Sequence, residues 1–163
     1  MKKSLILALL LCLALSACNV NINTQLIEGS GKPGSETRSL TGFDAIELSG
    51  SGDLEVVFGE NESVFIETDD NILPLIETRV RGGTLIISTK SNTNILPQLG
   101  IHIVVTMKSI KAVSLPGSGN ISIPGLQAQS FELDLPGSGN IAVEGSVEGL
   151  DAAISGSVNI LCG

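Results

Sequence analysis

The sequence predicts an all-β fold, specifically a β-solenoid or β-helix-like stack of rungs of about twenty residues with Gly-Ser-Gly-Asn corners. Two observations support this prediction. A nine-residue phrase at Leu115–Ile123 (LPGSGNISI) recurs twenty residues later at Leu135–Val143 (LPGSGNIAV), and repetition at such a fixed period is typical of a solenoid. Around each phrase, apolar residues alternate with polar ones, as expected for half-buried strands.

Two more distant copies extend the repeat. They are Leu48–Val56 (LSGSGDLEV) near the start of the domain and Ile154–Cys162 (ISGSVNILC) at its end. About five inward side chains per rung would contribute roughly 1.5–3 kcal/mol each. Each ordered residue loses about 1–2 kcal/mol of backbone entropy. One rung alone is therefore unstable, and the repeat predicts a stack of at least three.

Each copy places glycines at the corner between two strands. Glycine suits a sharp corner because it reaches positive φ without a steric clash. The asparagines Asn120, Asn140 and Asn159 are expected to form a column along one edge. Val158 departs from the pattern, because glycine occupies its position in the other copies. The predicted corner residues are Gly50, Gly52, Gly117, Gly119, Asn120, Gly137, Gly139, Asn140, Gly156 and Asn159.

Residues 1–17 are expected to be the signal peptide of a bacterial lipoprotein. Two lysines precede an apolar run from Leu5 to Leu15, which is too short to span a membrane as a helix. The run ends in Leu-Ser-Ala-Cys, which resembles a lipobox, where the signal is cut before Cys18 and this cysteine is acylated. Asn19, rather than Asp, follows the cysteine and favours the outer membrane. The alternative is an ordinary signal peptide followed by a chance cysteine.

Residues 18–40 are predicted to be the lipidated cysteine and a flexible tether, because they are polar and rich in Gly, Ser, Asn and Thr. Residues 41–163 are predicted to form the β-domain, in which β-rich runs alternate with turn residues. A short helical turn is expected within residues 70–79, limited by Pro74. The last copy stops midway through a rung, so we expect a further C-terminal rung or cap, or a neighbouring chain, to cover that edge.

The charge and composition argue against nucleic acid as a partner. The chain has nine basic and seventeen acidic residues, and removal of Lys2 and Lys3 with the signal leaves seven basic residues and a net charge of −10. Such a surface is poorly suited to nucleic acid or to anionic membrane faces. The chain has no Trp or Tyr, so neither base stacking nor an aromatic sugar platform is expected.

The residue types predict no cofactor, metal or nucleophile. His102 is the single histidine and is expected to face solvent on a strand, since no second histidine completes a site. Calcium is not expected, because the calcium-binding nonapeptide needs a repeated Asp and Asp53 is replaced by Asn in the later copies. Cys162 aligns with inward positions and is expected to be a buried thiol, with no disulfide partner left in the mature chain.

Two carboxylate pairs are the candidates for chemistry on a polysaccharide. They are Glu132 with Asp134, and Asp69 with Asp70. Glu132 and Asp134 alternate along one strand, which is also what a solvated outer face looks like. The sequence therefore favours a protein that is not an enzyme.

The order of motifs resembles the head GIN domain family, whose members are described as putative auto-transporter adhesins. The resemblance rests on Phe43–Ile46 (FDAI), Val64–Thr68 (VFIET), Gly83–Ile87 (GTLII) and the repeated Gly-Ser-Gly-Asn/Asp corners. It extends from about Leu40 to Gly163. It implies a solenoid-like all-β fold, a place in the bacterial envelope, often as a lipoprotein, and an adhesive role, with no enzymatic residues to carry over.

Three functions remain open at this point. The first is a lipid-anchored adhesin or binding module, held on the membrane by its N-terminal lipid, that meets a protein or glycan on a surface without catalysis. The second is a structural envelope lipoprotein that forms a homo-oligomer through its solenoid edges. The third, a glycan-active enzyme, is the least favoured. The expected location is the cell envelope, at the outer membrane, on either its surface or its periplasmic face.

Overall fold

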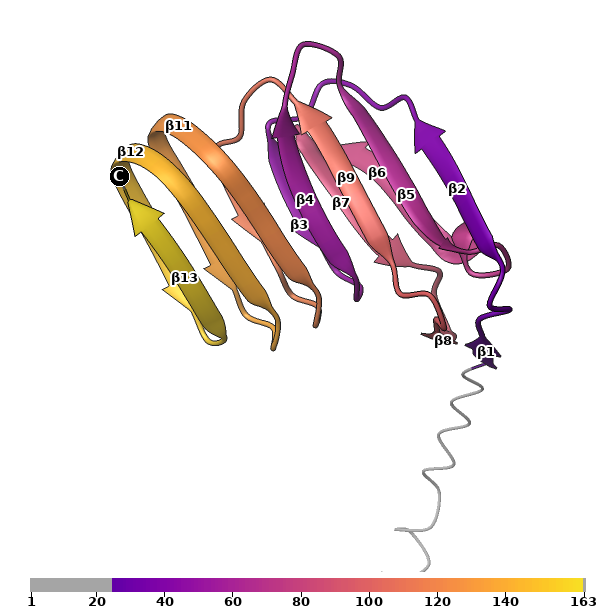
Figure 1. Ribbon diagram of the computed structural model, residues 1–163. Helices are drawn as coiled ribbons and strands as arrows, with labels where there is room; N and C mark the ends of the chain where they lie inside the picture. Colours follow the sequence, from indigo (N-terminus) through magenta and orange to yellow (C-terminus); the bar gives the residue numbers. More distant parts are fainter. Residues whose placement is uncertain (1–24, 163) are drawn as a thin grey trace, which may run out of the picture.

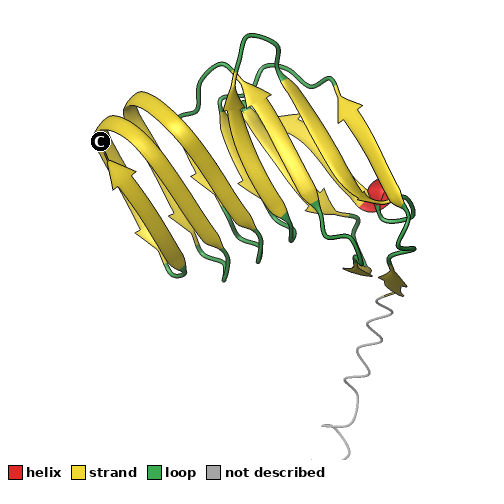
Figure 2. Ribbon diagram, in the orientation of Figure 1, coloured by secondary structure: helices red, strands yellow, loops and turns green. Residues whose placement is uncertain are grey.

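The computed structural model describes the backbone of residues 25–162 and shows an all-β protein (Figures 1 and 2). The alternation of apolar and polar residues generates the strands. In one of them, Leu54 and Val56 are buried while Asp53 and Glu55 are exposed. The expected helical turn is present as a single 3-10 turn, η2 (Leu73–Leu75), with Pro74 in its first positions.

The thirteen strands described are short, apart from two near the C-terminal end. They are β1 (Gln25–Glu28), β2 (Pro33–Arg38), β3 (Ala45–Leu48), β4 (Asp53–Phe58), β5 (Ser63–Asp69), β6 (Ile76–Arg81), β7 (Thr84–Thr89), β8 (Thr93–Leu96), β9 (His102–Met107), β10 (Ala112–Ser114), β11 (Asn120–Leu135), β12 (Asn140–Ile154) and β13 (Ser157–Cys162).

Within the described residues, eleven strands form one curled sheet. Its order is β2-β5-β9-β4-β11-β10-β3-β7-β6, with β12 beside β11 and β13 beside β12. β11 belongs to both halves of the curl, because its first residues pair with β4 and its last residues pair with β10. Figure 1 shows the half containing β4, β9 and β5 in front of the half containing β3 and β7. β1 and β8 form a separate two-stranded sheet.

A backbone bend lets β11 cross from one half to the other. The bend follows Ile123, where the register against β12 shifts before Leu126. Gly125 lies in it with a φ of 73°, a conformation that a residue with a Cβ adopts only with strain. β12 bends at the equivalent place, and the paired bends turn the sheet over the core.

The core lies between the two halves and is almost entirely aliphatic. Both halves contribute inward side chains, such as Ile46 and Leu85 from one and Val56 and Ile103 from the other. Full burial of such a side chain contributes roughly 1.5–3 kcal/mol. The larger fully buried side chains are Phe131, Ile46, Leu48, Leu54, Ile66, Ile72, Leu85, Ile87, Ile103, Met107, Ile110 and Leu115.

The repeat appears in the structure as parallel pairing at the same spacing. Val113 pairs with Leu133 and Ile121 pairs with Ile141, so successive copies lie directly over one another. The pairing of the strands nearer the N-terminus is not all parallel, because β2–β5, β5–β9 and β6–β7 are antiparallel pairs. The all-β prediction is confirmed, whereas a β-solenoid is not established for the domain as a whole.

The tether predicted for residues 18–40 is wrong for Gln25–Arg38. β2 pairs antiparallel with β5 along its whole length, and β1 pairs parallel with β8. These strands lack an apolar alternation because β2 lies at the edge of the sheet and most of its side chains face solvent. The proposed signal peptide and Cys18 lie outside the described residues.

Candidate functional site

The predicted corner glycines are stacked on one another in space. A Cβ on Gly117 would lie 1.9 Å from the carbonyl oxygen of Gly50, and one on Gly139 would lie 2.0 Å from that of Gly119. Such distances leave no room for a side chain. The expected reason, positive φ, holds only for Gly52, at 129°, among the predicted corner glycines. Gly117, Gly119, Gly137, Gly139 and Gly156 are therefore required by the contact between successive corners rather than by the sharpness of the turn, whereas a Cβ on Gly50 would meet only Thr89, at an ordinary 3.5 Å.

The residues after the corners form a ladder of side-chain hydrogen bonds across the sheet. The Nδ2 of Asn120 donates to Oδ1 of Asp53 at 2.7 Å, and the Nδ2 of Asn140 donates to Oδ1 of Asn120 at 2.9 Å. Asp53, Asn120 and Asn140 are paired in register, and His102 continues the same row on β9. The column expected from the sequence exists for the first two asparagines.

The third asparagine does not belong to this column. Asn140 lies opposite Ser157, and Asn159 lies opposite Ala142. The corner between β12 and β13 is therefore two residues shorter than the others, which agrees with Val158 in place of a glycine. The same shift places Cys162 opposite Gly145 rather than opposite Val143.

The outer face over β9, β4, β11 and β12 is hollowed by about 470 Å³. The ladder forms one row of its floor. A second row, two residues further along each strand, contains Glu55 and Ser122. The polar side chains that line the hollow and point to solvent are Asp53, Glu55, His102, Asn120, Ser122 and Asn140. The sequence identified Asn120 and Asn140 as structural corners and His102 as a solvent-facing strand residue, but it did not identify Glu55 or Ser122.

The hollow presents fixed hydrogen-bonding groups on a rigid surface. Carboxylates accept, the amides and Ser122 both donate and accept, and the imidazole of His102 does either according to its tautomer. Each side chain stands on a strand that is paired on both sides, so its position is set by the sheet. Such a surface is suited to recognising a ligand with many hydroxyl or amide groups.

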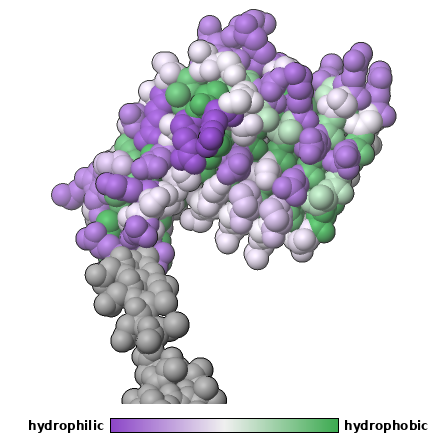
Figure 3. All heavy atoms as spheres, turned by 180° about the vertical axis from the view of Figure 1, so that it is seen from behind, coloured by the Kyte–Doolittle hydropathy of each residue, from purple (hydrophilic) through white to green (hydrophobic). Residues whose placement is uncertain are grey.

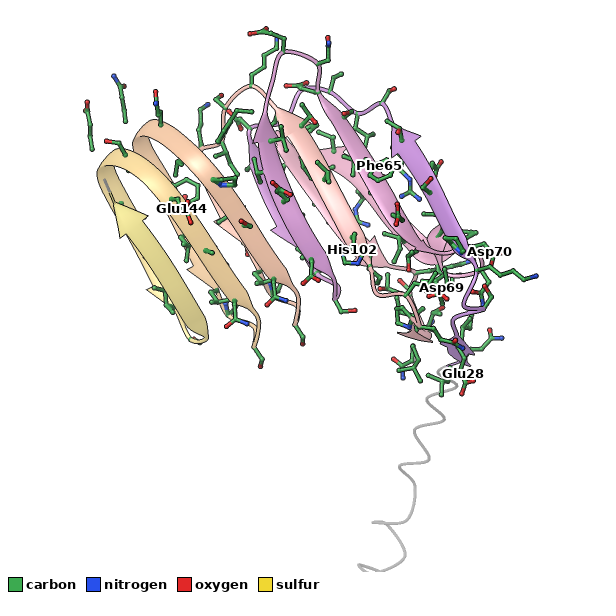
Figure 4. All side chains as sticks on the ribbon, viewed as in Figure 1. Glu28, Phe65, Asp69, Asp70, His102 and Glu144 are labelled. Carbon is green, nitrogen blue, oxygen red and sulfur yellow. The ribbon has the colours of Figure 1, made fainter. Side chains whose placement is uncertain are left out.

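The two predicted carboxylate pairs lie in different parts of the molecule. Glu132 and Asp134 stand on β11, where Glu132 is exposed and Asp134 accepts a hydrogen bond from Ser114 Oγ at 3.2 Å. Asp69 is the last residue of β5 and lies with Asp70 near the loop that follows Glu28 (Figure 4). The structure therefore brings neither pair to the hollow.

Asp69 is fully buried and accepts hydrogen bonds from three backbone amides. Gly31 N donates to Oδ1 at 2.7 Å, while Gln98 N and Leu99 N donate to Oδ2 at 2.9 and 3.2 Å. Burial raises the pKa of the carboxyl, but the hydrogen bonds from Leu99, Gly31 and Gln98 lower it more, and the pKa of Asp69 lies below the ordinary 3.8. This carboxylate is a structural acceptor rather than a general acid.

Around Asp69, further side chains fasten the segment from Glu28 to Lys32. Ser30 N donates to Asn71 Oδ1 at 2.9 Å, Asn71 Nδ2 donates to the Glu28 carbonyl at 2.8 Å, and Gln98 Nε2 donates to the Gly29 carbonyl at 2.7 Å. We call Asp69, Asn71 and Gln98 the N-terminal clamp. Sequence reasoning missed it, because its members are far apart in the chain.

No metal or membrane-spanning site is found within residues 25–162. That part of the chain holds no group of three or more His, Cys, Asp or Glu side chains arranged to bind a metal ion. It also holds no helix long and apolar enough to cross a membrane. His102 is exposed on β9, as expected.

The fold and the hollow define the class of protein: an all-β scaffold whose outer sheet face over β9, β4, β11 and β12 displays polar side chains. The family described as putative auto-transporter adhesin, head GIN domain, matches residues 42–162, and the chain belongs to this family. The resemblance noted from the sequence is therefore confirmed. Membership associates the chain with the cell envelope and with adhesins rather than enzymes.

Solved structures show the same fold. A putative adhesin from Bacteroides fragilis is 22% identical, with a TM-score of 0.72 over 81% of this chain and 63% of that one. A putative lipid binding protein from Parabacteroides distasonis is 21% identical, with a TM-score of 0.66 over 85% and 63%. A putative adhesin from Parabacteroides merdae is 17% identical, with a TM-score of 0.62 over 85% and 80%.

These likenesses concern the fold, because all three identities are below 25%. The chain spans about 63% of the length of the first two proteins. No curated protein matched the chain.

Proposed function

We propose that the protein is a lipid-anchored binding module of the bacterial cell envelope that recognises a glycan through the hollow over β9, β4, β11 and β12. The observation that carries the proposal is the row His102, Asp53, Asn120 and Asn140, which presents carboxylate, amide and imidazole groups in fixed register. Membership of an adhesin family supports a binding role. The protein performs no catalysis in this proposal.

Binding of purified envelope polysaccharides to the chain, measured by biolayer interferometry, tests the site. Glu55→Gln and His102→Ala should each weaken binding roughly two- to tenfold, the loss expected for one hydrogen bond. Glu77→Gln on β6 is the matched control, since Glu77 is exposed on another strand outside the hollow. Equal effects of Glu55→Gln and Glu77→Gln would count against the hollow as the site.

The anchor in this proposal is Cys18, acylated after removal of residues 1–17, with palmitate as the expected fatty acid and the outer membrane as the expected location. Metabolic labelling with a palmitate analogue should mark the wild-type chain and not Cys18→Ser. Protease treatment of intact and permeabilised cells then separates a surface location from a periplasmic one. Labelling of Cys18→Ser at the wild-type level would contradict the anchor.

We further propose that β10 to β13 form the solenoid-like part of the domain. The in-register pairing twenty residues apart supports this view. Insertion of a second copy of residues 116–135 after Leu135 should then give a folded protein with one more rung and a single unfolding transition. Loss of folding on insertion, when the parent chain folds, would argue that the stack has a fixed length.

A second function, self-association, is favoured by the apolar side chains that are exposed on β12, near the C-terminal end of the sheet. Leu150 and Ile154 on β12 are 46% and 47% exposed, whereas their register partners on β11, Phe131 and Leu135, are 2% and 0% exposed. Figure 3 shows hydrophobic atoms at this end of the molecule. Strand edges with exposed apolar side chains pair readily with other chains.

Analytical ultracentrifugation of the chain tests this second function. Concentration-dependent dimers that are lost in Leu150→Asp, and retained in the control Val57→Asp, would support pairing through this end. Val57 is a suitable control because it is similarly exposed, at 40%, but stands on β4. A strictly monomeric wild-type chain would exclude self-association.

A further inference from the structure

Three of the six large hydrophobic side chains exposed within the described residues occur in two neighbouring segments. Leu26 is on β1, while Leu96 ends β8 and Leu99 follows it, and they are 61%, 56% and 42% exposed. β1 and β8 are paired in parallel, with Leu26 opposite Asn94 and Glu28 opposite Leu96. Leu26 and Leu96 therefore lie diagonally on the same face of this small sheet. We call the β1–β8 pair the foot.

The foot is attached to the domain by both packing and hydrogen bonds. Ile27 and Ile95, on its opposite face, pack against the core. The N-terminal clamp fixes the segment that follows β1, and Gln98 N and Leu99 N, just after β8, donate to Asp69 Oδ2 at 2.9 and 3.2 Å. A Cβ on Gly29 would lie 2.6 Å from the Asp69 carboxylate, so the fit is close. The exposed leucines therefore occupy fixed positions relative to the domain.

The charge of the foot differs from that of the whole chain. The exposed charged residues of the foot and of the residues that flank it are Lys32 and Lys90 against Glu28 and Asp70, so these charges balance, while the chain as a whole carries seventeen acidic and nine basic residues. Asp70, which borders the foot, accepts a hydrogen bond from Ser30 Oγ. The exposed charges around the foot therefore cancel, so this part of the acidic protein carries no net charge that would oppose contact with a zwitterionic lipid surface.

The length of chain before β1 limits how far the foot can lie from an anchored membrane. Seven residue steps separate Cys18 from Gln25. A fully extended chain covers at most about 3.6 Å per residue, or about 25 Å in all. In Figure 1, β1 and β8 lie at the end of the molecule where the described chain begins, away from β12. A lipid on Cys18 would hold this end, and no other, at the bilayer.

We infer that the foot rests on the lipid surface, with Leu26 and Leu96 inserted at the level of the headgroups, so that the domain stands on the membrane in one orientation. Exposed leucines on a surface whose charges balance are suited to a shallow contact with a membrane. The inference rests on the proposed lipid anchor. It replaces the flexible tether expected from the sequence with a fixed mount.

The absence of tryptophan from the chain allows a direct test. Leu96→Trp places a unique fluorophore on the foot, and Leu150→Trp places one of similar exposure on β12. Each lipidated full-length variant is reconstituted into phosphatidylcholine vesicles with or without brominated acyl chains, and its emission is compared. Circular dichroism and thermal unfolding of both variants verify that they are folded.

We expect brominated lipid to remove most of the emission of Leu96→Trp and to shift the remainder to shorter wavelength, with no change for Leu150→Trp. Flotation of the vesicles separates the two proposals. Protein that does not float with the vesicles would refute the lipid anchor. Protein that floats but shows equal emission from Leu96→Trp with and without bromine would refute the foot and leave the anchor intact.

Discussion

At the scale of single residues, Asp69 shows how a buried charge is accommodated without a cation. Three backbone amides and complete burial define its environment, and hydrogen bonds to a charged acceptor are stronger than those to a neutral one. Its carboxylate joins the loop after β1 to the loop before β9. The residue looked like half of a catalytic pair in the sequence because hydrogen bonds to distant amides have no sequence signature.

Asp69 should make the stability of the protein depend on acid pH. Because the folded pKa lies below the ordinary 3.8, the carboxylate stabilises the fold above that pH, and this contribution is lost as pH falls from about 3.8 through the lowered pKa. Chemical denaturation at several pH values measures the effect.

Asp69→Asn should lower the Tm at neutral pH and flatten the acid dependence of stability, since an amide nitrogen would face backbone donors. Asp70→Asn is the control, because Asp70 is exposed. The same acid dependence in Asp69→Asn and the wild type would show that another group is responsible.

The corner glycines provide a second prediction at this scale. Gly139→Ala should destabilise the fold by about 3 kcal/mol, because its Cβ would overlap the Gly119 carbonyl and the corner would have to move. Gly149→Ala is the control, with its nearest contact at an ordinary 3.6 Å, and should change stability by no more than about 0.5 kcal/mol. Urea denaturation compares them, and equal effects would contradict the stacking explanation.

At the scale of elements, the repeated corners act together through the side-chain ladder. Asn120 takes part in two ladder hydrogen bonds and Asn140 in one within the described residues. Exposed hydrogen bonds contribute at the low end of the usual range, so Asn140→Ala should cost about 0.5 kcal/mol and Asn120→Ala about 1 kcal/mol. Thermal unfolding shows which of the two variants loses more stability. A larger loss in Asn140→Ala than in Asn120→Ala would rule out an additive ladder.

The elements also show what could be predicted from the sequence. Strands with a clear apolar alternation, such as β4 and β11, were predicted because their side chains face a core on one side only. The hairpin between β6 and β7 follows from Gly82 and Gly83, which both have positive φ. β1 and β2 were missed because edge strands are held by backbone pairing and need no apolar pattern.

The candidate site was predictable only in part, because register is a property of neighbouring strands. The sequence repeat placed Asn120 over Asn140, but it placed Asn159 in the same column, where the shorter last corner moves it by two residues. The sequence did not predict that Glu55 lines the hollow, because β4 pairs with β11 although the two strands are far apart in the chain.

At the scale of the whole molecule, the sheet has a protected centre and a less protected end. β9 is paired on both sides, by β4 and β5, and its inward side chains are buried. Residues 150–154 of β12 pair with β11, and no other described strand pairs with them.

Amide hydrogen exchange should therefore be slowest for Ile103 and Val105 and much faster for residues 150–154. Exchange of the isolated chain followed by NMR or mass spectrometry measures this order. Uniform protection across β9 and β12 would show that the end is covered in solution, which would favour self-association.

The N-terminal clamp also determines how the protein bears mechanical load. A pull between the start of the chain and the sheet is carried by the pairing of β1 with β8 and by the segment from Glu28 to Lys32, which is held by Asp69, Asn71 and Gln98. β1 runs parallel to β8, with four consecutive residues paired, so tension directed along these strands shears several hydrogen bonds together instead of opening them in sequence. With the proposed anchor before β1, a pull on the domain along these strands would therefore load the paired hydrogen bonds together.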